Sequence, residues 1–596
     1  MHSSIKRVHA LLGALALGLF AACWAVQAPV PPQPLAPPVD VEPASSPSFE
    51  VMSRPEVGRP PTPEQALERR LAALSREAER GRADRPAPGL IEFDVEGLSQ
   101  TLNALLGRYE DRASVSVHVR DLQTGHVLFD YFGDSPLIPA SNQKIVTSSA
   151  ALDLLGADYT FDTWVGRDGP VLYLVGEGDP SLMVDDLAAV ASLVTQHIDV
   201  AQLERLVVDD SVFSPQRFGP GYDAEGPGHA YQAPSGALSL SFNTIEVTVY
   251  PLANSSRLGV SVEPPSAHVR VDNRGRRGGS RNSVFIQTRS DGDQTVVSVD
   301  GRLPRGHGPV VVRRRINDPA LHTGTALAQM LAELSSTQLL PVSRGRAPDD
   351  AEVLVVNESL PLIEILDDGL AYSNNFIAEQ TLRTLAWRMT GDPGDWDAGQ
   401  QILHDYWEAL TGPQPLVIEN ASGLSRNGRL TTHGIVDLIA VAYRNASPEG
   451  SLIDALPAAG DEGTMRTRLR LSGKRVRAKT GTLDGVSGLS GVITSETGEP
   501  ALGFSILTNS QPHAGFVADS RRALEDRIVM EVLETLDAYE ARSEDPSAPS
   551  DEPGPTVASS WSTRPSKDRA CSAWPCAWPP EPGLDPGPDL RPTGAR

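Results

Sequence analysis

The chain has 596 residues, of which 40% are hydrophobic, and a formal net charge of −24 with a pI near 4.9. This length exceeds one ordinary domain, so we expect at least two, and the acidity argues against a nucleic-acid partner. The cysteines are Cys23, Cys571 and Cys576. Their positions near the chain ends exclude a cysteine nucleophile and a cysteine-based zinc site from the core.

The first 25 residues predict export from the cytoplasm. Lys6 and Arg7 precede an apolar run that ends in small residues, which is typical of an export signal and not of a spanning helix. Two endings stay open. Cleavage after Ala25 is favoured, because Phe20 fits a lipoprotein box poorly; the alternative is lipidation of Cys23, which would anchor the chain to the membrane. Either ending places the mature chain in the periplasm or cell envelope.

Residues 26–90 predict a linker and a stalk. The Pro-rich run over 28–64 cannot bury a core, and the amphipathic pattern over 62–80 predicts a helix that we assign to the stalk. A first part of the main domain is expected over 91–159. It would contain a helix followed by the paired strands ASVSVHVRD and HVLFDYF.

Residues 160–335 have a different character. Short strands punctuated by Gly and Pro dominate, and long helices are scarce, so we predict a β-rich insertion of one or two domains. The main domain should resume over 336–540 with a strand hairpin and a closing helix. Residues 541–596 are rich in Pro and are predicted to be a disordered tail.

The first stretch with candidate catalytic residues is PLIPASNQKIVTSSAALDLLG. A Pro-bearing turn leads into a helix that ends at Gly156, with Ser141 at its start and Lys144 one turn further on the same face. A serine hydroxyl needs a base before it can act as a nucleophile, and a lysine made neutral by burial can be that base. The plainer interpretation makes Ser141 a helix N-cap and Lys144 a solvated residue.

YSNNF, residues 372–376, lies between two apolar-periodic runs. Asparagine competes with the helical backbone for hydrogen bonds, so the stretch is either a polar turn between helices or a functional loop that presents Ser373 and Asn375.

VRAKTGTLDGVSGLSG supplies a third stretch. We expect Gly481 to leave room for a ligand against a strand edge, with hydroxyls from Thr480 and Thr482 and a cation from Lys479. Such an edge beside a nucleophile can bind an extended peptide by strand addition. The plainer interpretation is an edge strand protected by a lysine.

The three stretches occur in the order Ser-x-x-Lys, Ser-x-Asn and Lys-Thr-Gly, and two of the chain's five lysines fall in them. This set resembles that of the penicillin-recognising serine hydrolases. The long gap between the first two motifs, with GEGDPSL, YQAPSGALSLSFNT and ASGLSRNGRLT, is similar to the class C low-molecular-mass penicillin-binding proteins, the D-alanyl-D-alanine carboxypeptidase/endopeptidase family. The resemblance spans about residues 95–540. Asn420-Ala421 stands where that family usually reads Asp-Gly.

The resemblance implies an α+β fold, with a five-stranded antiparallel sheet flanked by helices and the 160–335 region inserted. It also implies an enzyme that cleaves peptidoglycan stem peptides and cross-bridges, is acylated by β-lactam antibiotics, and needs no metal or other cofactor. The implied catalytic residues are Ser141, Lys144, Ser373, Asn375 and Lys479, and the implied substrate-binding residues are Thr480, Gly481, Thr482 and Ser422.

By the same resemblance, Ser141 attacks the carbonyl and Lys144 is its base. Ser373 relays a proton to the leaving amine, Asn375 binds the substrate amide and steadies Lys144, and Lys479 supports the cation network. Thr480 and Thr482 receive the terminal carboxylate, and the N–H groups of Ser141 and Thr482 form the oxyanion hole.

Three alternatives stay in view. A β-lactamase shares the motifs but must deacylate fast and normally has a short insertion. An esterase of this fold usually replaces Lys-Thr-Gly, and a non-catalytic scaffold would have degenerate motifs. We also expect the insertion to shape access for bulky cell-wall strands without contributing to acylation.

Overall fold

The computed structural model describes residues 62–83, 93–445, 450–510 and 517–543. The predicted export signal with Cys23, the Pro-rich run as far as residue 61, and the predicted tail from residue 544 with Cys571 and Cys576 lie outside the described residues. Within the described ranges, none of the helices combines the length and apolarity needed to cross a membrane.

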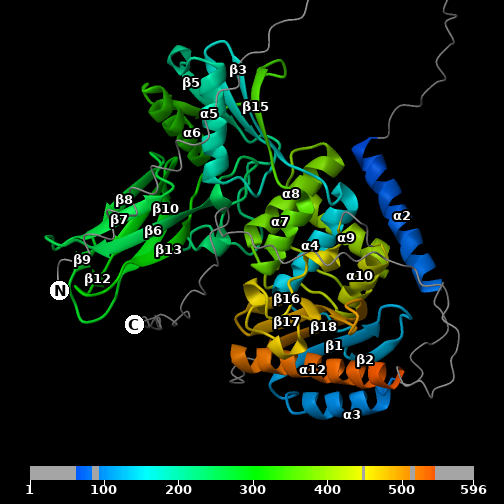
Figure 1. Ribbon diagram of the computed structural model, residues 1–596. Helices are drawn as coiled ribbons and strands as arrows, with labels where there is room; N and C mark the ends of the chain where they lie inside the picture. Colours follow the sequence, from blue (N-terminus) through cyan, green and yellow to red (C-terminus); the bar gives the residue numbers. More distant parts are fainter. Residues whose placement is uncertain (1–61, 84–92, 446–449, 511–516, 544–596) are drawn as a thin grey trace, which may run out of the picture. The chain divides into compact units, whose positions relative to one another are not determined.

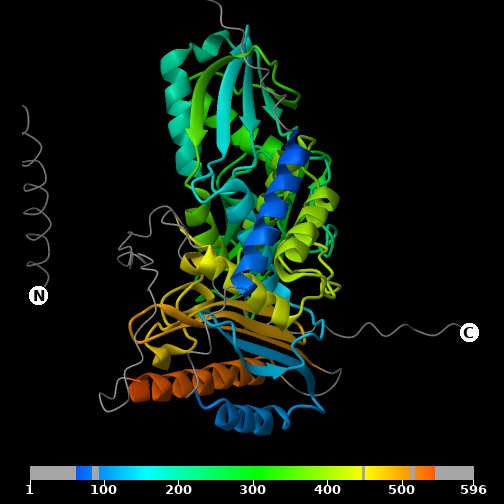
Figure 2. The ribbon, with the colours of Figure 1, turned by 90° about the vertical axis from the view of Figure 1, so that its right-hand side faces the viewer.

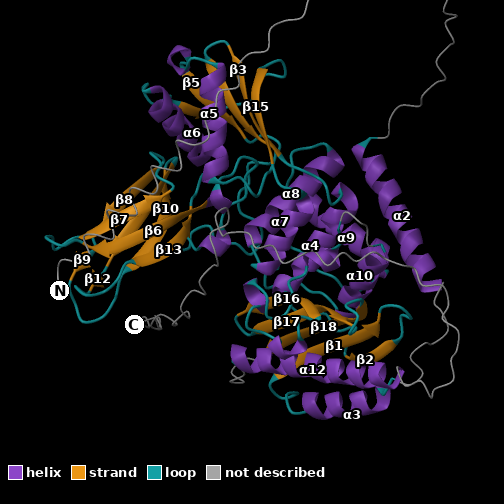
Figure 3. Cartoon of the chain, in the orientation of Figure 1, coloured by secondary structure: helices purple, strands orange, loops and turns teal. Residues whose placement is uncertain are grey.

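A five-stranded antiparallel sheet joins the two ends of the described chain (Figures 1 and 3). The first strand pairs with the last along nine residues, from Ala113↔Ser510 to Asp121↔Leu502. The predicted α+β fold with an antiparallel sheet is therefore confirmed. In order across the sheet, the strands are β16 (Val476–Leu483), β17 (Val486–Thr494), β18 (Pro500–Ser510), β1 (Ala113–Asp121) and β2 (Val127–Tyr131).

Helices cover both faces of this sheet. On one face, α3 (Val95–Leu106) and α12 (Ala518–Ser543) pack beside each other (Figures 1 and 2). Leu98, Leu102 and Leu106 recur at helical spacing and are buried in the core that these helices share with the sheet. The other face carries a helical layer, made of α4 (Gln143–Leu155), α7 (Leu362–Ala371), α8 (Asn375–Thr390), α9 (Trp396–Thr411), α10 (Thr432–Arg444) and α11 (Leu452–Ala455).

The predicted stalk helix belongs to this helical layer, so that assignment was wrong. Helix α2 (Pro63–Ala83) contacts α8 and α9, and Leu74 and Ala78 are buried in their core. The Arg70 Nε donates to the carbonyl of Asp153 at 3.2 Å. The apolar face of the amphipathic pattern is covered by the domain itself.

The insertion consists of two parts, and the first contains long helices that the sequence reading missed. Its mixed sheet has the order β14-β5-β4-β3-β15, and α5 and α6 share a core with it. The bounds are β3 (Asp162–Asp168), β4 (Val171–Gly176), α5 (Val184–His197), β5 (Arg205–Asp209), α6 (Pro319–Ser335), β14 (Val342–Arg344) and β15 (Glu352–Glu358). Since β14 and β15 pair with β5 and β3, this part continues past residue 335, where we had placed its end.

The second part of the insertion covers residues 244–315, and its regular elements are all β-strands. It contains the three-stranded sheets β13-β6-β7 and β10-β11-β8 and the pair β12-β9, around one apolar core. The bounds are β6 (Thr244–Pro251), β7 (Leu258–Glu263), β8 (Val269–Asn273), β9 (Arg276–Arg277), β10 (Phe285–Asp291), β11 (Gln294–Asp300), β12 (Arg302–Leu303) and β13 (Val310–Arg315).

Candidate active site

Ser141 lies in a tight turn that feeds the helix α4. The turn is the 3-10 segment η1 (Ala140–Asn142), and Ala140 holds a left-handed φ of 47°, which is rare for a residue with a side chain. The N-cap position of α4 is Asn142. The plainer interpretation of Ser141 as a helix cap is therefore wrong, and its half-buried hydroxyl is free for another role.

Lys144 is buried beside that hydroxyl. Its side chain is 2% exposed, and its Nζ donates to Ser141 Oγ at 3.2 Å, Asn375 Oδ1 at 2.7 Å and the Ser422 carbonyl at 2.8 Å. Burial lowers the pKa of Lys144 to about 7, although the carboxylate of Glu379 acts in the opposite direction. A solvated lysine is excluded, and a large share of this one is neutral near pH 7.

The two asparagines of YSNNF have separate tasks. Asn374 is the N-cap of α8, where its side chain accepts from the Phe376 N–H at 2.9 Å. Asn375 accepts from Lys144 and donates through Nδ2 to the carbonyl of Tyr231 at 3.0 Å. The stretch is thus both a helix start and part of the lysine site.

Ser373 precedes this cap with a left-handed φ of 56°. The residue is half-exposed, and within the described part of the chain its hydroxyl has no hydrogen-bond partner. The structure brings Asn375 to Lys144 through a direct bond, and it leaves the Ser373 hydroxyl able to bond an added molecule.

Lys479 is fully buried in the edge strand β16, and its Nζ donates to the carbonyl of Thr480 at 2.9 Å. Burial, and secondly the charge of Lys144, lower the pKa of Lys479 well below its usual value. An exposed lysine that protects a sheet edge is therefore not what this strand contains.

Among the described residues, backbone hydrogen bonds to the outer edge of β16 are found near its beginning. The Ala478 N–H donates to the carbonyl of Pro457 at 3.0 Å, so the N–H groups of alternate residues point away from β17. Thr480 and Thr482 follow at that spacing. Thr482 is exposed, whereas the Thr480 side chain is only 8% exposed. The Thr482 N–H accordingly points outward at the edge of β16, and the turn that carries Ser141 packs on the face of β16 and β17, at Gly481 and Gly488.

Gly481 has a different purpose from the one predicted. A Cβ at this position would lie 2.6 Å from Asn142 Nδ2 and 2.8 Å from the carbonyl oxygen of Pro139. The missing side chain therefore lets β16 pack against the turn that carries Ser141, and does not leave room for a ligand.

Ser422 also differs from its predicted role. Its side chain is fully buried and its carbonyl is an acceptor for Lys144, so the residue holds the lysine and does not face a substrate. Asn420 supports the same loop by accepting from the Gly423 N–H at 2.9 Å and donating to the carbonyl of Pro220 at 2.8 Å. An aspartate could accept the first bond but could not donate the second.

Glu379 was missed by the sequence reading. The residue is 2% exposed, and its carboxylate accepts four hydrogen bonds: from the N–H of Ser422 at 3.1 Å, the N–H of Ala421 at 3.3 Å, Trp396 Nε1 at 2.9 Å and the hydroxyl of Tyr222 at 3.3 Å. Four donors on two oxygens suit an ionised carboxylate. The residue lies one turn after Asn375, and a charged side chain inside an otherwise buried helix was the available signal.

The insertion contributes directly to this site. Tyr231 supplies the carbonyl that holds Asn375, Tyr222 donates to Glu379, and Pro220 accepts from Asn420. The expectation that the insertion is dispensable for acylation is therefore not supported by these contacts.

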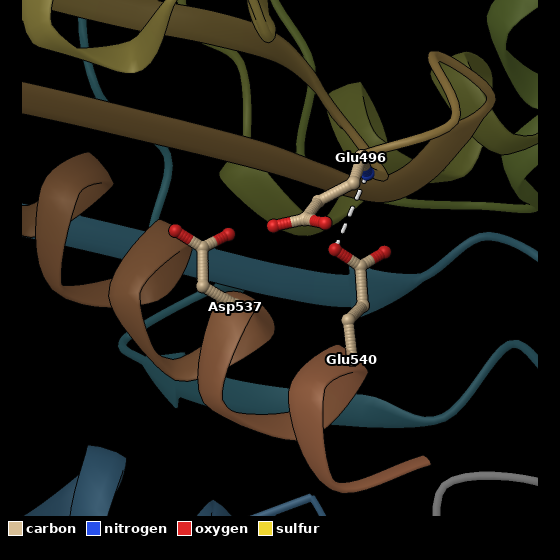
Figure 4. Close-up of side chains that lie close together, drawn as sticks. All are labelled: Glu496, Asp537 and Glu540. Carbon is tan, nitrogen blue, oxygen red and sulfur yellow. Dashed lines mark hydrogen bonds between the residues drawn. The ribbon is translucent and has the colours of Figure 1, made fainter. Parts of the chain in front are cut away.

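A cluster of carboxylates lies on α12 and the neighbouring turn (Figure 4). Carboxylate oxygens of Glu496, Asp537 and Glu540 lie within 4.8 Å of one another. Arg475 pairs with Asp537 and, at 3.1 Å, with Glu540, so a guanidinium already neutralises part of this charge. We assign the cluster to fastening α12 to β16.

The chain is similar to known proteins over most of its length. A model of the D-Ala-D-Ala carboxypeptidase 3 (S13) family matches residues 98–531. The chain is 35% identical over 469 residues to the D-alanyl-D-alanine carboxypeptidase of Actinomadura sp. (strain R39), covering 73% of this chain and 84% of that protein. It is 26% identical to carboxypeptidase DacB of Mycolicibacterium smegmatis, over 72% of this chain and 85% of the relative. The crystal structure of penicillin binding protein 4 from Haemophilus influenzae matches with a TM-score of 0.62 and 20% identity, over 74% of this chain and 99% of that one.

Gly481→Ala should lower the rate at which Ser141 is acylated without unfolding the domain. The new methyl group must displace the Pro139–Asn142 turn, and misplacement by about 1 Å can cost roughly 10²-fold in rate. The second-order rate of Ser141 acylation by a labelled penicillin, with the melting temperature, measures both effects. Gly306→Ala is the control, because no atom lies within 4 Å of a Cβ there. Acylation at the wild-type rate in Gly481→Ala would contradict the packing argument.

Proposed function

The chain belongs to the D-Ala-D-Ala carboxypeptidase 3 (S13) family, and on that premise we propose that Ser141 and Lys144 carry out its reaction on peptidoglycan stem peptides. The chain is a serine-type D-alanyl-D-alanine carboxypeptidase. The single observation that supports the assignment of the site is the bond of 3.2 Å between the buried Lys144 Nζ and Ser141 Oγ.

Acylation follows from that contact. Neutral Lys144 takes the hydroxyl proton of Ser141, and Oγ forms a bond to the carbonyl carbon of the substrate. The N–H groups of Ser141 and Thr482 stabilise the oxyanion. The bond to the leaving D-alanine amine then breaks as that amine gains a proton, and water hydrolyses the acyl-enzyme to regenerate Ser141.

The other residues orient this exchange. Asn375 Nδ2 has two hydrogens and gives one to Tyr231, so the second is available for the substrate amide. Ser373, whose hydroxyl has no hydrogen-bond partner among the described residues, relays the proton to the leaving amine. Thr480, Thr482 and the neighbouring Lys479 receive the terminal carboxylate.

The same chemistry extends to cross-bridges and to β-lactams. A cross-bridge presents an amide whose amine belongs to a second stem peptide, and the outer edge of β16 offers alternate N–H groups for an extended peptide. Endopeptidase activity and covalent β-lactam binding are therefore part of the proposal. A Dictyostelium discoideum relative, 24% identical, is named penicillin-sensitive carboxypeptidase A.

Peptidoglycan lies outside the cytoplasmic membrane, so the chain acts in the cell envelope. Cleavage after Ala25 and lipidation of Cys23 remain the two proposed endings of the export signal, and both positions lie outside the described residues.

Purified protein should release D-alanine from soluble pentapeptides and cleave cross-linked muropeptides, and a labelled penicillin should attach to Ser141. Ser141→Ala should abolish all three, because the hydroxyl is the nucleophile. Chromatography of the products and mass mapping of the labelled peptide measure these outcomes, and circular dichroism shows whether the variant is folded. Labelling that persists in folded Ser141→Ala would refute the assignment.

Acylation should rise with pH through about 7. Only the neutral form of Lys144 is a base, and its pKa of about 7 makes that form half-populated there and more abundant above it. The charge of Lys144 also lowers the pKa of the buried Lys479, so the midpoint belongs to the two coupled lysines. Lys144→Arg stays charged and should be slower by roughly 10²–10⁴-fold at every pH. An acylation rate that does not change between pH 5 and 9 in the wild type would contradict the assignment of Lys144 as the base.

Glu379→Gln should move that midpoint to lower pH and reduce the plateau rate. The charge of Glu379 raises the pKa of Lys144, so its removal lowers it. Each carboxylate oxygen also accepts a hydrogen bond from a backbone N–H. In the Gln variant one of these N–H groups would face the side-chain NH₂, which cannot accept its hydrogen bond. Glu525→Gln is the control, because it removes another fully buried carboxylate, bonded to Arg468 and Ser487. An equal midpoint shift in both variants would show that Glu379 has no specific effect.

A further inference from the structure

The second part of the insertion has a charge opposite to the rest of the chain. Residues 244–315 contain twelve arginines and six acidic residues, a net charge of +6, whereas the whole chain carries −24. Among the described residues, none that forms a hydrogen bond with Lys144 comes from this segment. The basic segment therefore needs an explanation separate from catalysis.

Three of these arginines form a row across neighbouring segments. Arg257 pairs with Arg276 in an isolated antiparallel bridge, and Arg276 pairs with Arg302 in the parallel ladder of β9 and β12. We call Arg257, Arg276 and Arg302 the arginine row. Strands lie about 4.8 Å apart, so the row places three cations along roughly 10 Å.

The row is held in register by backbone hydrogen bonds and faces solvent. The Arg277 N–H donates to Ser256 at 2.8 Å, and the Gly278 N–H donates to Leu303 at 2.8 Å. Leu258 and Leu303 are buried in the core of this part. Since side chains alternate between the two faces of a strand, the arginines that precede those leucines point outward.

Like charges directly opposite on neighbouring strands destabilise a sheet. Within the described residues, none of the three guanidiniums forms an ion pair, although Arg274 beside them pairs with Asp272 at 2.9 Å. Three aligned cations without carboxylate partners suit an external anion with repeated charges, because guanidinium groups match carboxylate geometry closely.

We propose that the arginine row is a non-catalytic attachment surface for the carboxylate-bearing peptidoglycan polymer itself. This inference rests on the proposed function, which places the chain on that polymer. Uncrosslinked stem peptides end in free carboxylates, so a glycan strand that carries many of them is a polyanion. The remaining chain is strongly acidic and is repelled by such a polymer, so the row also determines which side of the protein approaches it.

The test is co-sedimentation of the full chain with purified insoluble peptidoglycan, in a Ser141→Ala background that prevents turnover. Replacing the arginine row by Gln (R257Q, R276Q and R302Q together) should lower the bound fraction about threefold or more at low salt, with a smaller difference at high salt. The matched control replaces Arg69, Arg108 and Arg112, three exposed arginines of the main domain, by Gln.

With Ser141 restored, the row variant should hydrolyse soluble pentapeptide and react with penicillin at wild-type rates, and should digest insoluble peptidoglycan more slowly. Wild-type binding by the row variant, or an equal loss in the control, would overturn the proposal. So would binding to phosphatidylglycerol vesicles without binding to peptidoglycan. If the proposed function is wrong, the wild-type protein will neither hydrolyse pentapeptide nor be labelled by penicillin. The co-sedimentation experiment does not depend on that result, because it uses the inactive Ser141→Ala background.

Discussion

The site depends on a lysine that is buried without a directly paired carboxylate. Burial of a charged ammonium group costs free energy, which favours the neutral amine. Burial alone therefore makes Lys144 a base near neutral pH. Its three acceptors are a hydroxyl, an amide and a backbone carbonyl, which are all neutral. Glu379 acts from one layer further out, where its charge limits the fall in pKa without binding the lysine.

The surrounding structure follows from holding those acceptors in place. The Ser422 carbonyl faces Lys144 because Glu379 binds the two N–H groups of its loop, and Asn375 faces it because Asn374 begins the helix one residue earlier. Gly481 brings β16 against the turn on the remaining side. Residues that never touch a substrate thus decide whether Ser141 has a base.

The sequence was informative where chemistry and periodicity are local. The motifs singled out Ser141 and Lys144, which the structure joins by a hydrogen bond, and the resemblance those motifs carry predicted the antiparallel sheet. Packing between segments that are distant in the chain could not be predicted from the sequence. Helix α2 was assigned to a stalk because amphipathicity does not say what covers the apolar face. The strand-rich context of 160–335 obscured α5, although Leu187, Val190, Ala191 and Val194 follow helical spacing. The tasks of Ser422, Glu379 and Gly481 depend on contacts with distant segments.

The departure at Asn420 shows how closely the insertion and the catalytic loop depend on each other. Asn420 uses both halves of its amide, one within the loop and one toward Pro220. Aspartate, which the resemblance leads us to expect at this position, would lose the bond to Pro220. It would also add a negative charge one residue from the N–H groups that Glu379 binds. This chain therefore attaches its loop to the insertion with a neutral group, which leaves Glu379 as the carboxylate that acts on Lys144.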